Sequence, residues 1–273
     1  MKNILKAKFI EELGDITMNM YSQGWDERNG GNISYLLYEE DLKGYLDLNK
    51  VIRKIPLGFK ADEIVKGKIF LVTGTGKYFK NVKKDPETNL GIVRISSNLE
   101  EAELLWGYKD GGKFTSEFPA HLMSHASRLK VDPNHRVIMH THPTYTICMG
   151  ACLPTDDLAF TSALWHNNTE AIVVFPDGIG VLPCMICGTN EIGIATAKKM
   201  ENFRLVSWTN HGIYGSGKDI DEAFGLIETV EKTAKIYMLT LGHAINTIPD
   251  EVLKGLAKLW NLTPIKGILK EDE

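Results

Sequence analysis

The chain has 273 residues, 43% of them hydrophobic and 24% charged, a composition typical of a globular protein and not of a disordered or fibrous one. A chain of this length buries enough surface to fold without disulfides or a structural metal. The net charge of −4, with Lys and Arg scattered along the chain, argues against nucleic acid and an acidic membrane surface as partners.

The N-terminal residues and the cysteines indicate a cytoplasmic protein. No stretch approaches the roughly 18 uncharged apolar residues of a membrane span, and Glu11 and Glu12 fall where a signal peptide has its apolar core. The four cysteines form two close pairs, Cys148 with Cys152 and Cys184 with Cys187. We expect reduced, buried thiols, because both pairs lie among apolar residues; a structural zinc on the two pairs is the alternative.

Hydrophobic patterning predicts a single α/β domain over residues 1–273, with no internal repeat and no linker long enough to separate two domains. Apolar residues at three- and four-residue steps predict a first helix over Ala7–Gly24, which Gly24 can end in the left-handed conformation. Runs rich in β-branched and aromatic residues predict strands over Ile33–Tyr38, Ile69–Thr73, Gly91–Ser96, Arg136–His140, Ala171–Phe175 and Leu205–Trp208. Further helices are predicted at about Phe118–Lys130, Glu191–Phe203, Ile220–Leu241 and Glu251–Trp260, with Thr189, Asp219 and Asp250 as N-terminal caps and Gly242 as a C-terminal stop. We therefore expect a mostly antiparallel or mixed β-sheet layered between helices, with strands spaced too irregularly for a simple doubly wound repeat.

Two histidines leave the predicted strand that begins at Arg136, in the sequence His140-Thr141-His142. Strand side chains alternate between faces, so both imidazoles project to one side with Cα atoms about 7 Å apart, close enough to reach one metal. A single histidine at such a place is more often a core residue with its hydrogen bonds satisfied. The pair favours a metal site.

A third candidate ligand is His211, which follows the predicted strand Leu205–Trp208. Asn-His-Gly alone is typical of a plain turn, but Gly212 permits a backbone turn that aims an imidazole back at a site. Strand ends on one side of a sheet tend to converge, and three ligands with one open position are the pattern of catalytic zinc.

The segment Thr115-Ser116-Glu117-Phe118-Pro119 precedes a predicted helix. Ser116 and Glu117 can be a cap and a first-turn acid that complements the helix dipole. Alternatively, Glu117 acts as a base beside a metal, and the helix N-terminus holds a phosphate. Two glycine-containing loops also fit phosphate binding, Asn29–Asn32 and Thr73–Lys77.

A third glycine-rich segment, Gly212–Asp219, matches a nucleotide-binding P-loop except at its last position. There Asp219 replaces the Ser or Thr hydroxyl that binds magnesium, and it adds negative charge beside phosphates. We interpret these glycines as a tight strand connection and Lys218 as solvated.

With Ser-Glu-x-Pro, His-x-His and Asn-His-Gly in this order, the chain resembles the class II aldolase/epimerase family. Longer runs are similar to those of the members that act on L-rhamnulose 1-phosphate: Gly24–Ser34, Phe70–Phe79, Asn89–Val93, Phe175–Gly178 and Phe224–Ile227. The similarity extends over nearly the whole chain. The three histidines identify only the wider family, whereas the run Trp25–Asn32 is specific.

The resemblance implies a three-layer αβα fold and one Zn²⁺ per subunit, held by His140, His142 and His211, with Glu117 as the catalytic acid/base. It implies a pocket for substrate and phosphate formed by Asn29, Gly31, Asn32, Thr75, Gly76, Thr115 and Ser116. It also implies a cyclic homotetramer, in which Glu170 serves the site of a neighbouring subunit.

The implied activity is the reversible cleavage of L-rhamnulose 1-phosphate to dihydroxyacetone phosphate and L-lactaldehyde through a metal-stabilised enediolate, in L-rhamnose degradation. Two alternatives stay open. One is a sibling aldolase or epimerase acting on fuculose 1-phosphate or ribulose 5-phosphate, and the other is a non-catalytic binding module on the same fold. Neither the residues nor the resemblance assigns a role to Tyr145, or names the group that protonates the departing alkoxide.

Overall fold

The computed structural model describes residues 2–270, and one continuous sheet of nine strands runs through this part of the chain. The strands are β1 (Asn32–Leu37), β2 (Arg53–Pro56), β3 (Ile69–Thr73), β4 (Leu90–Ile95), β5 (Glu101–Gly107), β6 (Val137–Thr141), β7 (Gly180–Leu182), β8 (Leu205–Trp208) and β9 (Gly212–Gly217). Their order is β2-β5-β4-β3-β1-β6-β9-β8-β7. Only the β7–β8 pair is parallel among these strands, so the sheet is mixed, as expected.

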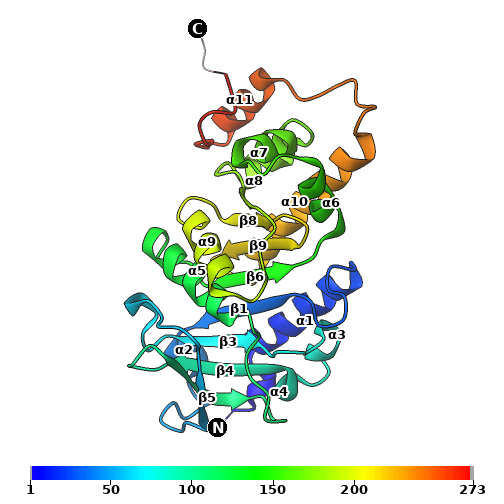
Figure 1. Ribbon diagram of the computed structural model, residues 1–273. Helices are drawn as coiled ribbons and strands as arrows, with labels where there is room; N and C mark the ends of the chain where they lie inside the picture. The colour runs from blue at the N-terminus through cyan, green and yellow to red at the C-terminus, as the bar shows by residue number, and fades with distance from the viewer. Residues whose placement is uncertain (1, 271–273) are drawn as a thin grey trace.

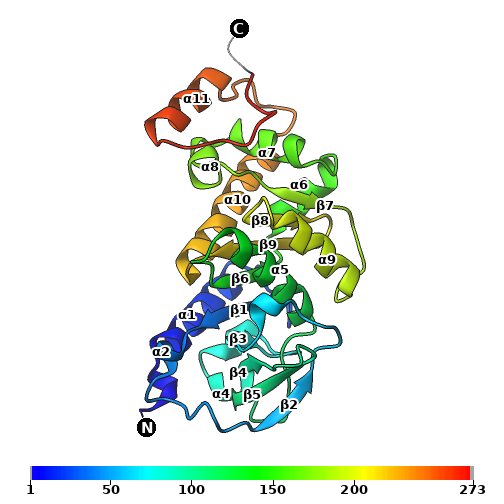
Figure 2. The ribbon, with the colours of Figure 1, turned by 90° about the vertical axis from the view of Figure 1, so that its left-hand side faces the viewer.

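Helices cover both faces of this sheet. They are η1 (Ile4–Lys6), α1 (Lys8–Ser22), α2 (Glu39–Leu42), η2 (Glu63–Val65), α3 (Phe79–Val82), α4 (Pro86–Asn89), α5 (Phe118–Val131), α6 (Thr144–Cys152), α7 (Asp157–Trp165), α8 (Thr169–Val174), α9 (Asn190–Lys199), α10 (Ile220–Thr240) and α11 (Asp250–Leu259). Figure 1 shows the strands stacked from β5 near the N-terminus up to β8, with α11 beyond them at the C-terminal end. In Figure 2, α1 and α10 lie on one side of the strands and α5 and α9 on the other. The predicted three-layer fold is confirmed.

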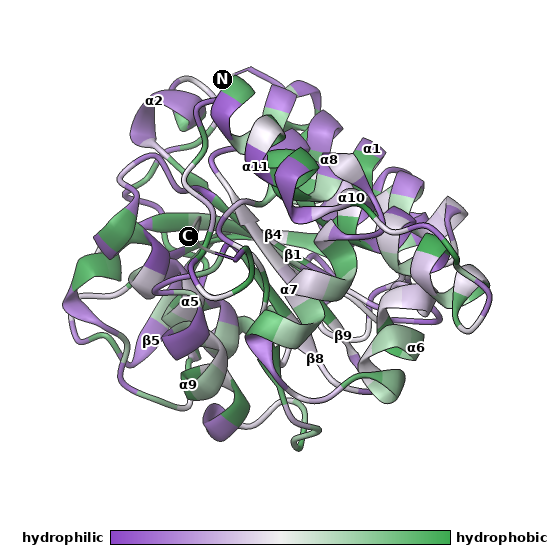
Figure 3. Ribbon diagram, turned by 90° about the horizontal axis from the view of Figure 1, so that it is seen from above, coloured by the Kyte–Doolittle hydropathy of each residue, from purple (hydrophilic) through white to green (hydrophobic). Residues whose placement is uncertain are grey.

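The core follows from the alternation of side chains along each strand. In β1, Ile33 and Tyr35 pack in one buried cluster with residues of α1 and α10, whereas Leu36 packs on the other face with Phe118 and Leu122 of α5. Figure 3, seen from above and coloured by hydropathy, shows hydrophilic and hydrophobic segments alternating along the helices. This is expected for helices that each pack one face on the sheet and expose the other to solvent.

Most predicted elements correspond to observed ones, and β3 and β8 have the predicted bounds. Gly24 and Gly242 follow α1 and α10 with φ of +75° and +79°, and the Asp219 side chain caps α10 by accepting a hydrogen bond from the Glu222 N–H. Thr189 occupies the N-cap of α9 without a side-chain bond. Asp250 is the first residue of α11, and Pro249 holds the cap position predicted for it.

The predicted strand over Ala171–Phe175 is wrong, because most of this run belongs to α8. The side chain of Asn168 caps that helix by accepting from the Glu170 N–H, and Ala171 and Ile172 are fully buried. Gly212–Gly217, predicted as a tight connection, is strand β9. Patterning also missed β2, β5 and β7.

All four cysteines carry free, exposed thiols, so their predicted burial is wrong. Within residues 2–270 the one group of side chains placed to hold a metal contains no cysteine. No helix in the same range is long and apolar enough to cross a membrane.

Candidate metal centre and active site

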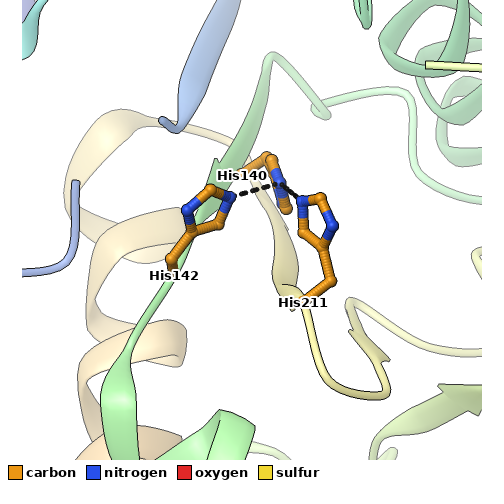
Figure 4. Close-up of side chains that lie close together, drawn as sticks. All are labelled: His140, His142 and His211. Carbon is orange, nitrogen blue, oxygen red and sulfur yellow. Dashed lines mark hydrogen bonds between the residues drawn. The ribbon is translucent and has the colours of Figure 1, made fainter. Parts of the chain in front are cut away.

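Three histidines converge at one edge of the sheet. His140 lies in β6, His142 follows the end of that strand, and His211 lies in the turn between β8 and β9. Because β9 pairs with both β6 and β8, the turn is held beside the end of β6. Figure 4 shows the three rings pointing toward one another. The Nε2 atom of His140 lies 3.2 Å from that of His211 and 3.3 Å from that of His142.

The outer ring nitrogens show why these Nε2 atoms face one another. Nδ1 of His140 is 3.1 Å from the carbonyl oxygen of Ile213, and Nδ1 of His142 is 3.0 Å from a carboxylate oxygen of Glu27. Both partners only accept, so each Nδ1 carries the proton and each Nε2 presents a lone pair. Two lone pairs at 3.3 Å repel unless a cation lies between them. The spacing fits zinc, because tetrahedral ligands at the usual Zn–N distance are about 3.3 Å apart.

The surroundings keep the imidazoles of His140 and His211 neutral, which is the form that binds a metal. His140 is buried, and burial holds its pKa well below the ordinary value. Burial, with the nearby His142, lowers the pKa of His211 to about 4. The His140 ring stacks on Tyr214 and lies against Trp208, which fixes its orientation. Outside the ring cluster, the Cys187 thiol lies against Nδ1 of His211.

Glu117 lies beside this centre. Its Oε2 atom is 3.6 Å from Nε2 of His140, accepts a hydrogen bond from the amide of Asn32 (2.9 Å), and is 3.3 Å from the hydroxyl of Tyr214. Glu117 itself holds the N-cap position of α5 and makes no side-chain capping bond, and no acid lies in the first turn, so the interpretation of Ser116 as the cap and Glu117 as a first-turn acid is wrong. Burial raises its pKa, and the bonds from Asn32 and Tyr214 oppose that rise. A buried carboxylate with a raised pKa is suited to take up and release a proton.

The loop Asn29–Asn32 lies against the histidines. A Cβ at Gly30 would lie 2.8 Å from Nδ1 of the His142 ring. Gly31 has a φ of +73°, and a Cβ there would lie 1.9 Å from Oδ1 of Asp26, so no larger residue fits. Asn32 begins β1 and pairs with His140, while Asn29 is exposed.

The other two predicted phosphate segments meet at the same edge of the sheet. The Thr75 N–H donates to the carbonyl of Lys113 (2.9 Å), and the Thr115 N–H donates to the carbonyl of Thr73 (3.0 Å). The Thr73 hydroxyl oxygen accepts from the Ile33 N–H, which ties this pair of segments to β1. Thr75 and Gly76 are therefore held close to Thr115, to the exposed Ser116 and to Glu117.

Two residues lie apart from this group. Glu170 is exposed in the first turn of α8, and its side chain is not among the hydrogen-bond or ion-pair partners of the three histidines or Glu117 in the described part of the chain. Tyr145 is the second residue of α6, where its backbone N–H donates to the buried carboxylate of Glu231. This bond does not involve the phenol, so the role of the Tyr145 side chain stays unassigned.

The sequence interpretation missed Glu27 and Tyr214. Glu27 stands in the run Trp25–Asn32, in which only the glycines and asparagines carry a recognisable phosphate-binding pattern. Tyr214 stands between glycines in the segment compared with a P-loop, and nothing in the sequence marks it as a neighbour of Glu117.

Comparison with known proteins agrees with this geometry. Residues 11–238 match the family described as Class II Aldolase and Adducin N-terminal domain. The rhamnulose-1-phosphate aldolase of Enterococcus faecalis is 51% identical over 271 residues, covering 98% of this chain and 97% of the relative. That of Listeria monocytogenes is 49% identical over 270 residues, covering 98% of both chains. The crystal structure of a sugar-phosphate aldolase from Thermotoga maritima matches with a TM-score of 0.75 and 31% identity, covering 87% of this chain and 96% of the other. The chain therefore belongs to the Class II Aldolase and Adducin N-terminal domain family.

Proposed function

We propose that this chain is a zinc-dependent aldolase that reversibly cleaves L-rhamnulose 1-phosphate into dihydroxyacetone phosphate and L-lactaldehyde. The names of the two relatives that are about half identical to it support this substrate. The observation that carries the chemistry is Oε2 of Glu117, 3.6 Å from Nε2 of His140. A proton carrier beside a cation site is what carbon–carbon cleavage next to a ketone requires.

The Nε2 atoms of His140, His142 and His211 are the ligands for one Zn²⁺ per subunit. Bound zinc supplies a Lewis acid that stabilises negative charge on the ketone oxygen. In cleavage the carbon–carbon bond breaks, the hydroxyl of the aldehyde fragment loses its proton, and Glu117 returns one proton to the carbon of the three-carbon fragment; in synthesis Glu117 removes that proton and the aldehyde oxygen gains one. Asn32 and Tyr214 both contact Oε2, which leaves Oε1 of Glu117 to face the substrate carbon.

The substrate phosphate binds between the loop at Asn29 and Gly31, the turn at Thr75 and Gly76, and the start of α5 at Thr115 and Ser116. Backbone N–H groups at glycines and at a helix start suit an anion, and the exposed side chains of Asn29 and Ser116 add donors. We assign Asn32, first predicted to bind substrate, to the support of Glu117, because its amide nitrogen donates to that carboxylate.

We also propose a homotetramer, in which Glu170 of one subunit reaches the site of its neighbour. The exposure of this carboxylate, and its separation from the site residues of its own subunit, support that role.

The test is a cleavage assay that compares rhamnulose 1-phosphate with fuculose 1-phosphate and ribulose 5-phosphate, together with elemental analysis. We expect preferred cleavage of rhamnulose 1-phosphate and about one zinc per chain, since three imidazoles leave one open position. Preferred turnover of either other sugar would reassign the substrate within the family. Metal-free protein with no turnover of any of the three would instead indicate a binding module.

A further inference from the structure

A chain of buried polar side chains extends from Glu117 into the layer between α5 and the sheet. We call Asn32, His121, Ser34, His125 and His135 the histidine chain. His121 and His125 follow Glu117 at four-residue steps along α5, so all three lie on one face of the helix. Ser34 points to that face from β1. All five residues are at most 6% exposed.

Each member contacts the next. The Asn32 amide oxygen is hydrogen-bonded to Nε2 of His121, and Nδ1 of His121 is 2.7 Å from the Ser34 hydroxyl. That hydroxyl is 2.8 Å from Nε2 of His125, and Nδ1 of His125 is 2.8 Å from Nε2 of His135. None of these residues has a part in the proposed chemistry apart from Asn32.

The chemistry of Glu117 fixes the direction of every bond. A carboxylate only accepts, so Asn32 turns its NH₂ toward Glu117 and its oxygen toward His121. Nε2 of His121 must then carry the proton, and its Nδ1 accepts from the Ser34 hydroxyl. The Ser34 oxygen accepts from His125 Nε2–H, and His125 Nδ1 accepts from His135 Nε2–H. The reverse direction would turn the Asn32 oxygen toward the carboxylate oxygen of Glu117.

We propose that His121 is a positioning residue for Glu117, which acts through the Asn32 amide, and that Ser34 and His125 hold the His121 ring in the required tautomer. This inference rests on the proposed role of Glu117 as the proton carrier. Without the donor on His121, the Asn32 amide can rotate and present its oxygen to the carboxylate. Glu117 then loses the hydrogen bond that holds Oε2 in place and so keeps Oε1 facing the substrate.

The first test compares His121→Phe with His121→Gln in the zinc-loaded enzyme. Phenylalanine fills the space of the ring but has no donor, whereas the glutamine amide can place an N–H near the position of Nε2. In His121→Phe, we expect kcat and the exchange of the carbon-bound proton of dihydroxyacetone phosphate with solvent to fall by up to about 100-fold, the loss that a displacement of about 1 Å can cause. KM and zinc content should stay the same, and His121→Gln should recover most of the rate. Wild-type exchange in folded His121→Phe would overturn the proposal.

The second test uses two serines. Ser34→Ala cuts the histidine chain, while Ser124→Ala removes a buried hydroxyl on α5 that has no hydrogen-bond partner in the described residues. We expect slower proton exchange in Ser34→Ala and wild-type exchange in Ser124→Ala. If the proton exchange rate fell equally in both variants, the cause would be a general disturbance of the buried layer, and the proposal would be overturned.

A third measurement needs neither activity nor a variant that folds. In wild-type protein labelled with ¹⁵N-histidine, the ring shifts of His121 should report the Nε2–H tautomer at neutral pH. The Nδ1–H tautomer would overturn the proposal even in an active enzyme. If the wild-type enzyme neither cleaves the sugar nor exchanges the proton, the proposed function fails, and the tautomer still decides the direction of the histidine chain.

Discussion

At the scale of single residues, Glu117→Gln separates proton transfer from metal binding. Glutamine keeps the size of the side chain but removes the basic oxygen. We expect proton exchange of dihydroxyacetone phosphate to fall by a factor on the order of 100 to 10,000, the usual contribution of general acid–base catalysis. Zinc content should be unchanged, because Glu117 is not one of the three converging ligands. Exchange near the wild-type rate in folded, zinc-loaded Glu117→Gln would refute its assignment as the proton carrier.

The convergence of His140 and His142 was predictable because their spacing has a chemical meaning: residues two apart on a strand project to the same side, and this needs only strand geometry. The pattern around Glu117 left a helix-start role and a role as a base open, and only the family resemblance implied the second. Glu27 and Tyr214 were not predictable in this way, because their contacts join segments 115 and 97 positions apart in the chain. The four-residue steps from Glu117 to His121 and His125 were visible in the sequence. They gain meaning only when the structure shows Ser34 between the two rings.

At the scale of elements, the turn that contains Thr75 and Gly76 provides a test of phosphate binding. Gly76 has a φ of +69° with open space where a Cβ would lie. In Gly76→Val, a side chain blocks the approach of an anion to the backbone, so we expect a higher KM for the phosphorylated sugar and unchanged zinc content.

A matched control is Gly67→Val, on the turn before β3. Gly67 has a φ of +70° and equally open space, so both variants carry the same left-handed strain of about 1–2 kcal/mol. Steady-state kinetics should show a raised KM only in Gly76→Val. If KM rises equally in both, backbone strain and not phosphate contact is the cause.

Two elements, α8 and β9, show why the local sequence pattern is insufficient to predict secondary structure. The run Ala171–Phe175 is rich in β-branched residues, yet the Asn168 cap and tertiary packing make most of it a helix, since β-propensity depends on context. Strand β9 was hidden by its glycines. Gly215 and Gly217 lie under α10, where a Cβ would come within 2.7 Å of Ile227 and Ala223, so this strand lacks the side chains that would show alternation.

At the scale of the whole molecule, the metal is expected to stabilise the fold without being required for it. His142→Ala should lose zinc and activity together. In metal-free protein, however, the variant should be at least as stable as the wild type, because the change removes a lone pair that faces His140 at 3.3 Å. Added zinc should raise the free energy of unfolding of the wild type and not that of His142→Ala, since it binds the folded state through the three histidines.

Urea unfolding with and without zinc measures both effects. The control is His166→Ala, which removes a similarly buried histidine that contacts Asp250 and not the metal centre. This variant should still be stabilised by zinc. Unfolding of His142→Ala in the absence of urea would show instead that the site is structural.

The buried histidines also predict how the stability of the whole molecule depends on pH. Burial lowers the pKa of His121 and of His135 to about 3 and holds that of His125 well below the ordinary value. Between pH 6.5 and about 3 the unfolded chain therefore binds protons that the folded chain cannot, so the free energy of unfolding must fall as the pH falls. Each such histidine contributes a slope of about 1.4 kcal/mol per pH unit well below pH 6.5.

Asp26 has the opposite effect on the pH dependence of the free energy of unfolding. Burial raises its pKa to about 8, so the folded chain keeps a proton that the unfolded chain releases above pH 3.8, and this contribution to stability is lost as the pH rises toward 8. Burial also raises the pKa of Glu117 and of Glu231, so three acids oppose the histidine effect, but in metal-free protein His140 and His211 bring the histidines with a lowered pKa to five. Urea unfolding of metal-free protein should therefore show greatest stability near pH 6.5, a steep loss toward pH 4.5 and a shallow loss toward pH 8. Constant stability from pH 6.5 to 4.5 would mean that the folded protein accepts protons on these histidines, and it would contradict their placement as buried, neutral links between Glu117 and the interior.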